Sequence, residues 1–451
     1  HTAIKTKGWY EYMKSQEKSL ALYERAAKSI AGGHLSNFKQ HPGNPQTFFD
    51  HFEGAKMYDV DGNMYYDWSL SSGPCILGQH SPIVINAIKE QAERCYSRQY
   101  MEIQVEAAEE FCKYVPCADK MHFAVTGGES ILYTIRTARA YTGKNMVVRF
   151  NGMYHGGTDF VLGGVPTTDS DYHAVNSYRE GDDYSKACYT TGRAAHALND
   201  TYLIDFNDLK QMEELFRSDN DIACVIMEPV CLNITGCMPE PGYLEGVRKL
   251  CDEYGVLLVF DETLTGFRIG LHGAQGYFNI MPDMASFAKA VCGGVPGAAF
   301  CGKEEVMKVL DDCTCIIPGT YNGNSISAAC MKAVLSELGK DDGAAYQKIE
   351  KLGNMFKEGV LDAAKKHDIP MLMQGFAGAL FPVFTEKSVI RNHKEALAYS
   401  DLDKMHRFGA LMKQNGVIGD DRYCVSLAFT EDDVIQSIAI ADKVLGILKE
   451  D

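Results

Sequence analysis

Short apolar stretches alternate with helix-like stretches through the middle of the chain. The apolar stretches end at glycine turns or polar residues, whereas the stretches between them repeat apolar residues every three to four positions. Strands are expected within residues 121–130, 145–152, 221–230 and 256–262, and helices at 131–143 and 243–255. Strands that alternate with helices build a mostly parallel sheet covered by helices, so the pattern predicts an α/β fold.

The two ends of the chain show different patterns. Residues 19–30 have helical spacing, and residues 55–70 alternate about a central Asp-Gly as a β-hairpin does. After about Ser325 the chain is expected to be mainly helical, ending in an amphipathic helix at 431–450. We therefore predict an N-terminal segment that contributes to a small domain (1–75), a large domain (76–325) and a C-terminal part of the small domain (326–451).

Composition and charge limit the classes of function. The chain has 451 residues, 46% of them hydrophobic, and a formal net charge of −16. A chain of this length can bury a large core divided into two or three subdomains. Its acidic residues are spread along the sequence, so the surface field repels nucleic acid and anionic membranes, and neither is expected as a partner. Any bound anion needs a local device.

Two further features indicate a cytoplasmic protein. No apolar run approaches the roughly 18 residues that cross a bilayer, and the N-terminal stretch lacks the apolar core of a signal peptide. The fifteen cysteines include no CxxC pair, although a disulfide framework or a structural zinc site would show paired spacings. We therefore expect reduced thiols and no metal.

The strand that ends at Asp261 poses a question. In "GVLLVFDETLTGFR" a buried run leads straight into Asp261 and Glu262, and further on the apolar run "MASFAKAVCGG" holds Lys289. Ligands of open α/β sheets bind beyond the carboxyl ends of the strands. Asp261, Glu228 and the glycine turn at 127–128 all fall at that edge of the expected sheet, so their polar groups can share one site.

Three motifs each permit two interpretations. The turn "TGGES" around Gly127 and Gly128 can present the amides of a helix start to a phosphate, or it can be an ordinary tight turn. Lys289 can be a desolvated amine that forms a Schiff base with an aldehyde, or a lysine whose charged head reaches water. Asp261 can act on a ligand or cap the turn that follows the strand.

Taken together, the motifs point to pyridoxal phosphate. An enzyme that uses this cofactor needs a lysine for the aldehyde, a carboxylate for the pyridine nitrogen and an anion cup for the phosphate. Lys289, Asp261 and the glycine turn at 127–128 provide all three. Tyr154, in "NGMYHGG", adds an aromatic ring that can lie on the cofactor or pack in the core.

A family resemblance rests on these same segments. "EPV" at Glu228, "FDETLTGFR" around Asp261, "FAKAVCGGVPGAAFCG" around Lys289 and "PGTYNGNSISAA" around Thr320 resemble the class III, fold-type I pyridoxal phosphate aminotransferases. The resemblance extends through nearly the whole chain and is strongest to the glutamate-1-semialdehyde aminomutase branch and related amino acid aminotransferases. It implies a large cofactor-binding domain, a small α+β domain built from both termini, and a homodimer whose active sites are shared at the interface.

The resemblance also implies a role for each matched residue. Lys289 would be the Schiff-base lysine, Asp261 the partner of the pyridine nitrogen, and Tyr154 the aromatic that stacks on the ring. Thr320 would reach the phosphate of the neighbouring subunit. The expected cofactor-binding set is Gly127, Gly128, Ser130, Tyr154, Glu228, Asp261, Thr263, Lys289 and Thr320.

Several positions near the expected cofactor depart from the family pattern. Gly128 stands where the family usually has threonine, so a hydroxyl to the phosphate is missing or comes from Ser130. Thr263 stands where valine is usual, which adds a hydroxyl under the ring. Ser72 replaces the tryptophan that precedes "GP" in the aminomutases.

The expected substrate residues come from both ends of the chain and from one loop. Ser36 and Asn233 match the aminomutases, whereas their arginine near the N-terminal glycines appears here as Lys39. Asp421 is the match for an acidic residue of their C-terminal region. Lys39 and Arg422 lie in segments expected to close over the site, so each is either a clamp for a carboxylate or a solvated surface charge.

We therefore expect an aminotransferase that moves an amino group between a small-molecule donor, an amino acid or amine, and a keto acid or aldehyde acceptor. An intramolecular aminomutase of the glutamate-1-semialdehyde type and an amino acid racemase remain alternatives. A protein that binds the cofactor without turnover is an alternative from a different class. The segment 165–198 is longer than that branch leads us to expect, which leaves the substrate open.

Overall fold

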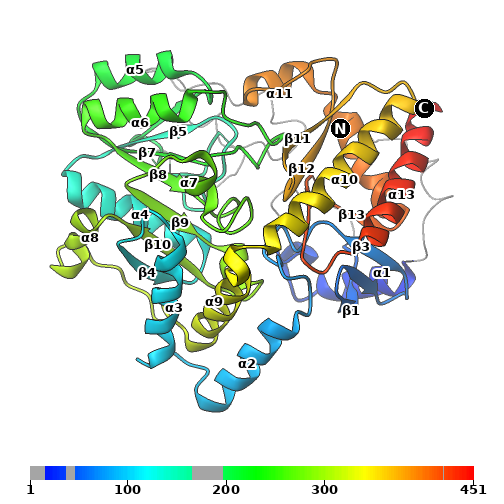
Figure 1. Cartoon of the computed structure of the whole chain (residues 1–451), viewed down its shortest axis with the longest axis horizontal. Coiled ribbons are helices and arrows are strands. Elements are labelled where there is room, and N and C mark those ends of the chain that lie inside the picture. Colours follow the sequence, from blue (N-terminus) through cyan, green and yellow to red (C-terminus); the bar gives the residue numbers. More distant parts are fainter. Residues whose placement is uncertain (1–15, 37–45, 165–193, 195–196, 420, 451) are drawn as a thin grey trace.

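The structure is a computed structural model that describes residues 16–36, 46–164, 194, 197–419 and 421–450. Within these residues, a large body is built on a seven-stranded sheet and a smaller body on two short sheets (Figure 1). The α/β class expected from the sequence is confirmed.

The central sheet of the large body has the strand order β4-β10-β9-β8-β7-β5-β6. β10 runs antiparallel to both of its neighbours, and the pairs from β9 to β6 are parallel. All strands except β10 therefore point the same way, and their carboxyl ends meet at one edge. The strands are β4 (Lys120–Ala124), β5 (Met146–Phe150), β6 (Thr201–Ile204), β7 (Ile222–Met227), β8 (Leu257–Asp261), β9 (Met284–Phe287) and β10 (Ala298–Gly302).

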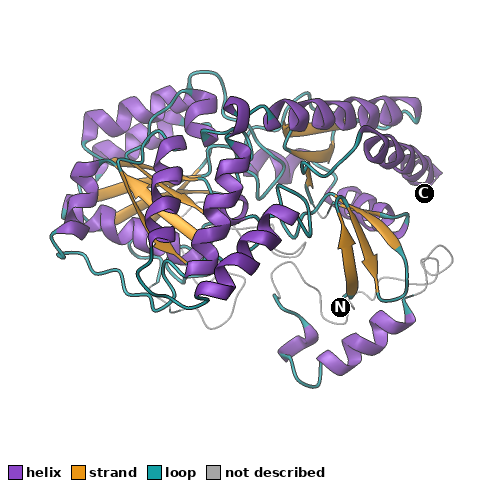
Figure 2. Ribbon diagram, turned by 60° about the horizontal axis from the view of Figure 1, so that its bottom comes forward, coloured by secondary structure: helices purple, strands orange, loops and turns teal. Residues whose placement is uncertain are grey.

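Helices cover both faces of this sheet (Figure 2). Every residue of β7 and β8 is buried, which explains why these strands read as continuous apolar runs without alternation. The helices of the large body are α2 (Pro82–Arg94), α3 (Glu102–Tyr114), α4 (Gly127–Thr142), α5 (Leu209–Ser218), α6 (Tyr243–Tyr254), α7 (Gly273–Phe278), α8 (Glu304–Asp311) and α9 (Ser325–Leu338).

The smaller body combines the two ends of the chain. β1 (Phe49–Glu53), β2 (Lys56–Asp59) and β3 (Met64–Asp67) form a meander, and the pairing of β2 with β3 confirms the hairpin expected within residues 55–70. β13 (Val417–Ile418) pairs in parallel with β3. The blue and red ends of the chain therefore share one sheet (Figure 1).

The C-terminal region is less helical than the sequence pattern predicts. β11 (Met371–Phe376), β12 (Ala379–Phe384) and β14 (Tyr423–Cys424) form a three-stranded antiparallel sheet. All of β12 is buried, so its sequence lacks the alternation that marks a strand. The expected helix at 431–450 is confirmed as α13 (Glu431–Glu450), and the remaining helices are α10 (Ala345–Lys366), α11 (His393–Tyr399) and α12 (Leu402–Gln414).

The N-terminal helix also differs from the pattern. α1 spans Glu17–Ala26 and is followed by a separate 3-10 turn at Ala31–Gly33, whereas one helix at 19–30 was expected. Among the residues that the structure describes, no helix is both long and apolar enough to cross a membrane.

Candidate active site

A cavity of about 350 Å³ opens at the carboxyl edge of the central sheet. The loops that follow β4, β5, β7, β8 and β9 build its walls. Eight residues expected from the sequence line it, namely Gly127, Gly128, Tyr154, Glu228, Asn233, Asp261, Thr263 and Lys289. The structure thus brings together residues that stand far apart in the sequence, from Gly127 to Lys289.

Asp261 is the last residue of β8 and is 3% exposed. Its Oδ1 accepts a hydrogen bond from the backbone amide of Thr263 at 2.9 Å, which holds the carboxylate at the end of the strand. Its Oδ2 lies 2.7 Å from Nδ1 of the buried His155. With its proton on Nδ1, His155 donates to the carboxylate and fixes its direction.

His155 was missed by the sequence interpretation, although it stands directly after Tyr154 in "NGMYHGG". The signal was a histidine in a glycine-rich turn at the expected ligand edge. Its partner Asp261 lies 106 positions away at the end of β8, so the two residues meet only in the folded sheet.

Lys289 follows β9 and opens a short 3-10 turn. Burial and, after it, the charge of Arg422 lower the pKa of its amine to about 7, while the carboxylates of Glu228 and Asp261 oppose the shift. A lysine with this pKa is about half neutral at neutral pH, and the neutral amine is both a nucleophile and a base. The motif expected to carry a reactive lysine therefore has the electrostatics that such a lysine needs.

Glu228 follows β7 and organises the loop on one wall of the cavity. Its Oε1 accepts hydrogen bonds from the Tyr154 amide at 2.8 Å and from Nδ2 of Asn233 at 2.7 Å. Its Oε2 accepts from the amide of Leu232 at 3.0 Å. Burial raises the pKa of Glu228, and the Asp261 charge adds to the rise while His155 counteracts it. Glu228 thus positions Tyr154 and Asn233 rather than standing free in the cavity.

The start of α4 forms the third wall. Thr126 caps the helix by accepting from the amide of Glu129 at 3.2 Å, while the Glu129 carboxylate accepts from the Thr126 amide at 3.3 Å. The backbone of Gly156 approaches Gly128 so closely that a Cβ on Gly156, whose φ is +100°, would lie 2.8 Å from the Gly128 Cα. Position 156 therefore requires glycine, and the amides at a helix start favour an anion.

The structure corrects the expectation for Ser130. Its side chain is fully buried, with Oγ 2.6 Å from Ser286 Oγ and a hydrogen bond to the Ala299 carbonyl at 2.8 Å. Ser130 therefore faces strands β9 and β10, which carry its partners, and it is not among the residues that line the cavity. It cannot supply the hydroxyl that Gly128 lacks.

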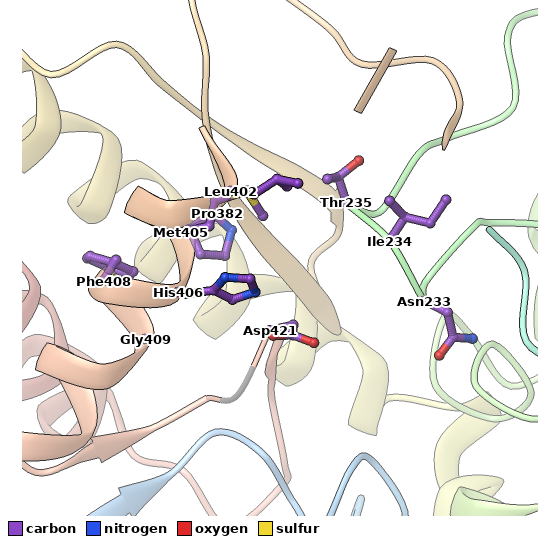
Figure 3. Close-up of a pocket in the computed structure, with 10 residues that line it drawn as sticks. All are labelled: Asn233, Ile234, Thr235, Pro382, Leu402, Met405, His406, Phe408, Gly409 and Asp421. Carbon is purple, nitrogen blue, oxygen red and sulfur yellow. The ribbon is translucent and has the colours of Figure 1, made fainter. Parts of the chain in front are cut away.

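Asn233 lines the main cavity and also a second, smaller cavity of about 30 Å³ between the two bodies. Figure 3 shows Asn233, Ile234 and Thr235 of the large body on one side of this space, with His406 and Asp421 of the small body on the other. The structure thus places two expected substrate residues, Asn233 and Asp421, at one junction.

The other described residues expected to bind substrate or phosphate do not line either cavity. Arg422 donates from Nη1 to the Leu232 carbonyl at 2.8 Å, next to Asn233, and its charge acts on Lys289. Ser36 and Thr320 are exposed and lie outside the linings of both cavities. Lys39 lies outside the described residues, as does most of the segment 165–198.

The fold and the cavity first define a class of protein. An α/β sheet that brings a lysine, a buried carboxylate and a glycine-lined helix start to one cavity is typical of pyridoxal phosphate-dependent transferases of fold type I. The sequence profile of the family Aminotransferase class-III matches residues 38–445. The chain belongs to this family, and it is an enzyme of amino-group transfer.

Individual relatives agree with this assignment. Glutamate-1-semialdehyde 2,1-aminomutase 2 of Lachnoclostridium phytofermentans is 33% identical over 449 residues, covering 95% of this chain and 99% of the relative. An omega-transaminase from Sphaerobacter thermophilus superposes with a TM-score of 0.85 at 23% identity, covering 95% of this chain and 97% of the other. A glutamate-1-semialdehyde-aminomutase from Pseudomonas aeruginosa gives 0.82 at 23% identity, covering 96% and 94%. The two structural likenesses show the same fold.

Proposed function

We propose that this chain uses pyridoxal phosphate to move an amino group between an amino acid or amine and a keto acid or aldehyde. The observation that carries the proposal is the placement of Lys289 and Asp261 on the walls of one cavity that also holds the start of α4. The cavity volume lies in the range of roughly 300–1,000 Å³ that is common for small-molecule sites. Bound there, the cofactor would supply an electron-withdrawing ring that stabilises negative charge at the substrate Cα.

Several residues of the cavity would contact the bound cofactor. The first amides of α4 would hold the phosphate, Asp261 would face the ring nitrogen, and Tyr154 would lie on the ring. Burial raises the pKa of the Tyr154 phenol, as does the charge of Asp261. The phenol of Tyr154 therefore stays neutral beside the Asp261 carboxylate. The pair of Asp261 with His155 keeps one carboxylate direction fixed for the ring nitrogen.

Lys289 has two tasks in this scheme. Its amine would hold the aldehyde of the bound cofactor, and with substrate in place it would carry a proton to and from the substrate Cα. The pKa of about 7 supports the second task, because the neutral form accepts a proton and the charged form returns it near neutral pH.

We infer further that two copies of the chain share their sites. Large apolar side chains are exposed on the loop before α3 and on the loop before α9, namely Tyr96, Tyr100, Ile316 and Tyr321. Asn324 Nδ2 joins the two loops by donating to the Tyr96 carbonyl, and Gln104 Nε2 of α3 donates to the Gly323 carbonyl, both at 2.9 Å. An ordered apolar face of this kind suits a second copy, and Thr320 lies within it.

Two reaction types compete at this site. The aminomutase named among the relatives favours an amino shift within one molecule. A mutase, however, must retain its intermediate between two half-reactions and benefits from a closed pocket. Here Ser72 stands where the aminomutases have tryptophan, and Lys39 stands where they have arginine. We therefore give transfer to an external acceptor precedence, with racemisation as a third outcome.

A labelled amino donor separates these outcomes. The enzyme is mixed with a nitrogen-labelled amino acid or amine and an unlabelled keto acid or aldehyde, and the products are analysed by mass spectrometry. We expect the label on the acceptor. Label that stays within one isomerised carbon skeleton would show that the enzyme is a mutase. Inversion of the donor without transfer of label would show that it is a racemase.

Arg422 is the residue from which we expect recognition of a substrate carboxylate. Its replacement by alanine should lower kcat/KM for amino acid donors by about 10- to 100-fold, the effect of losing a hydrogen bond to a charged group. Donors that lack the carboxylate should be affected much less. Because the Arg422 charge helps to lower the pKa of Lys289 to about 7, its loss should raise that pKa, and the pH at which uptake of pyridoxal phosphate by the apoprotein levels off should rise with it.

Arg217 provides a matched control for this experiment. It lies on α5, is 65% exposed and pairs with Glu213 on the same helix. Arg217→Ala should leave both donor types and the pH profile unchanged. Equal losses for carboxylate and non-carboxylate donors in Arg422→Ala would remove Arg422 from substrate recognition and leave it a support for the Leu232 loop.

A further inference from the structure

A strained turn lies between β3 and the cavity. Leu70, Ser71 and Ser72 have φ values of +50°, +58° and +70°, and Gly73 follows at +107°. Side chains disfavour this left-handed region, where residues other than glycine usually occur singly. Three such residues in a row persist only when the surrounding structure holds them there.

Hydrogen bonds of Asp67 and Gln79 keep the turn in this conformation. Asp67 ends β3 and is completely buried, and its Oδ1 accepts from the Leu70 amide at 2.8 Å. Its Oδ2 accepts from Nε2 of Gln79 at 3.0 Å, and the same Nε2 reaches Ser71 Oγ at 2.9 Å. The Sγ of Cys75 donates to the other end of the Gln79 amide at 3.4 Å. We call Asp67 and Gln79 the turn clamp.

The turn ends against Lys289. A Cβ on Gly73 would lie 3.3 Å from Leu264 Cδ2 and 3.9 Å from Lys289 Cδ, so the backbone of Gly73 borders the stem of the lysine. The Gly73 carbonyl accepts from Nη2 of the buried Arg268, whose Nη1 reaches the Val425 carbonyl at 3.2 Å. The turn is therefore fixed on both sides.

Lys289 itself has a φ of +53°. The left-handed turn thus ends next to a second residue whose backbone lies in the left-handed region. Strain of this kind gathers where geometry is needed for function. Leu264 and Lys289, which Gly73 borders, both line the main cavity.

We propose that Asp67 and Gln79 are positioning residues, which hold the left-handed turn at Leu70–Gly73 against the stem of Lys289 and so keep its amine aimed into the cavity. This inference rests on the proposed role of Lys289. Loss of the clamp lets the turn relax toward ordinary φ values, and the lysine then loses the wall that limits its rotamers.

The first test is Gln79→Met, which keeps the side-chain length and removes both hydrogen bonds from Nε2. In the apoprotein we expect faster amide hydrogen exchange in residues 69–76 and slower covalent uptake of pyridoxal phosphate by Lys289, measured after borohydride trapping. In the holoenzyme kcat should fall more than KM rises. A misplacement of about 1 Å costs up to roughly 100-fold, and we expect a loss of about 10- to 100-fold.

A pair of second substitutions isolates the strain. In the Gln79→Met background, Ser71→Gly and Ser71→Ala both remove the hydroxyl, but only glycine adopts a φ of +58° without strain. Glycine should restore most of the uptake rate and of kcat, whereas alanine should not. If Gln79→Met fails to fold, Ser71→Ala and Ser71→Gly can be compared in the otherwise unchanged protein, because Ser71 is exposed. We again expect faster uptake and a higher kcat with glycine.

Gln211→Met is the matched control, because Gln211 Oε1 also makes a structural hydrogen bond, accepting from the Asp205 amide at 2.7 Å, and Gln211 lines neither cavity. It should change neither uptake nor kcat. Normal uptake and kcat in Gln79→Met would contradict the positioning role of Asp67 and Gln79. Equal uptake rates and kcat for the Ser71→Gly and Ser71→Ala variants would contradict it as well. Absence of amino transfer in the unchanged enzyme would instead contradict the proposed function, since uptake and hydrogen exchange are measured without turnover.

Discussion

Replacement of Lys289 by alanine should abolish amino transfer to within the detection limit of the labelled-donor assay. The lysine is both the point of covalent attachment and the base at the substrate Cα, and general acid-base catalysis alone contributes about 10²- to 10⁴-fold. Its amine has the environment for this work, because burial and the charge of Arg422 lower its pKa to about 7.

The variant should also lose covalent retention of the cofactor. After borohydride reduction and denaturation, pyridoxal phosphate should remain on a tryptic peptide that contains Lys289 in the unchanged enzyme and be absent from the variant. Lys210→Ala, on the outer helix α5 where the side chain is 85% exposed, serves as the control and should behave as the unchanged protein does. Retention on another lysine in the alanine variant would contradict the assignment.

The pH dependence of uptake provides a further measurement on the same residue. Burial lowers the pKa of Lys289, so its amine is charged below about pH 7 and neutral above it. The rate of uptake should therefore increase about tenfold per pH unit below this value and level off above it. A plateau reached only near the usual lysine pKa would show that the amine is not desolvated.

Replacement of Asp261 by asparagine should reduce kcat by about 10²- to 10³-fold, the usual effect of removing a main electrostatic stabiliser. Asparagine has nearly the same shape, so the amide of Thr263 keeps its acceptor and the fold survives. The lost quantity is the negative charge that would keep the ring nitrogen protonated. The measurement is single-turnover kinetics with saturating donor, together with the melting temperature.

Asp283 offers a control of the same residue type at the opposite edge of the sheet. Burial alone would raise its pKa, but hydrogen bonds and charges from Lys303 and Arg248 lower it, with contacts of 2.6 and 2.8 Å. Asp283→Asn should therefore lower the melting temperature and leave kcat nearly unchanged. If Asp261→Asn instead shows near-normal kcat, Asp261 has no electrostatic role at the ring.

The edge of the sheet could be located from sequence because strand ends leave a clear mark. Apolar runs that stop at Asp261 and at the glycine turn 127–128 place polar groups where parallel strands end. The neighbouring Glu262 has a structural role: Thr265 Oγ1 and the amides of Ala274 and Gln275 donate to its carboxylate. Two adjacent carboxylates thus serve opposite faces, one toward the cavity and one toward α7.

Other features had no local signal. The buried strand β12 shows no alternation, and the antiparallel direction of β10 depends on pairing with β4 and β9. The partner of Asp261 is a histidine on a different loop, and the side chain of Ser130 is held by Ser286 and the Ala299 carbonyl on other strands. Each of these is decided by contacts between distant segments, which a pattern along the chain does not contain.

The parallel pair of β3 and β13 gives the site a long-range dependence in sequence. Asp67 of the turn clamp pairs with Ile418, and Nε1 of the adjacent Trp68 donates to Ser437 Oγ across 369 positions at 3.0 Å. During synthesis on the ribosome, the large sheet with Asp261 and Lys289 can form while β3 still lacks this neighbour. Contacts of such high contact order form late. The wall beside the lysine is therefore completed only when the last part of the chain has emerged, so a truncated product can carry the reactive residues without a finished site.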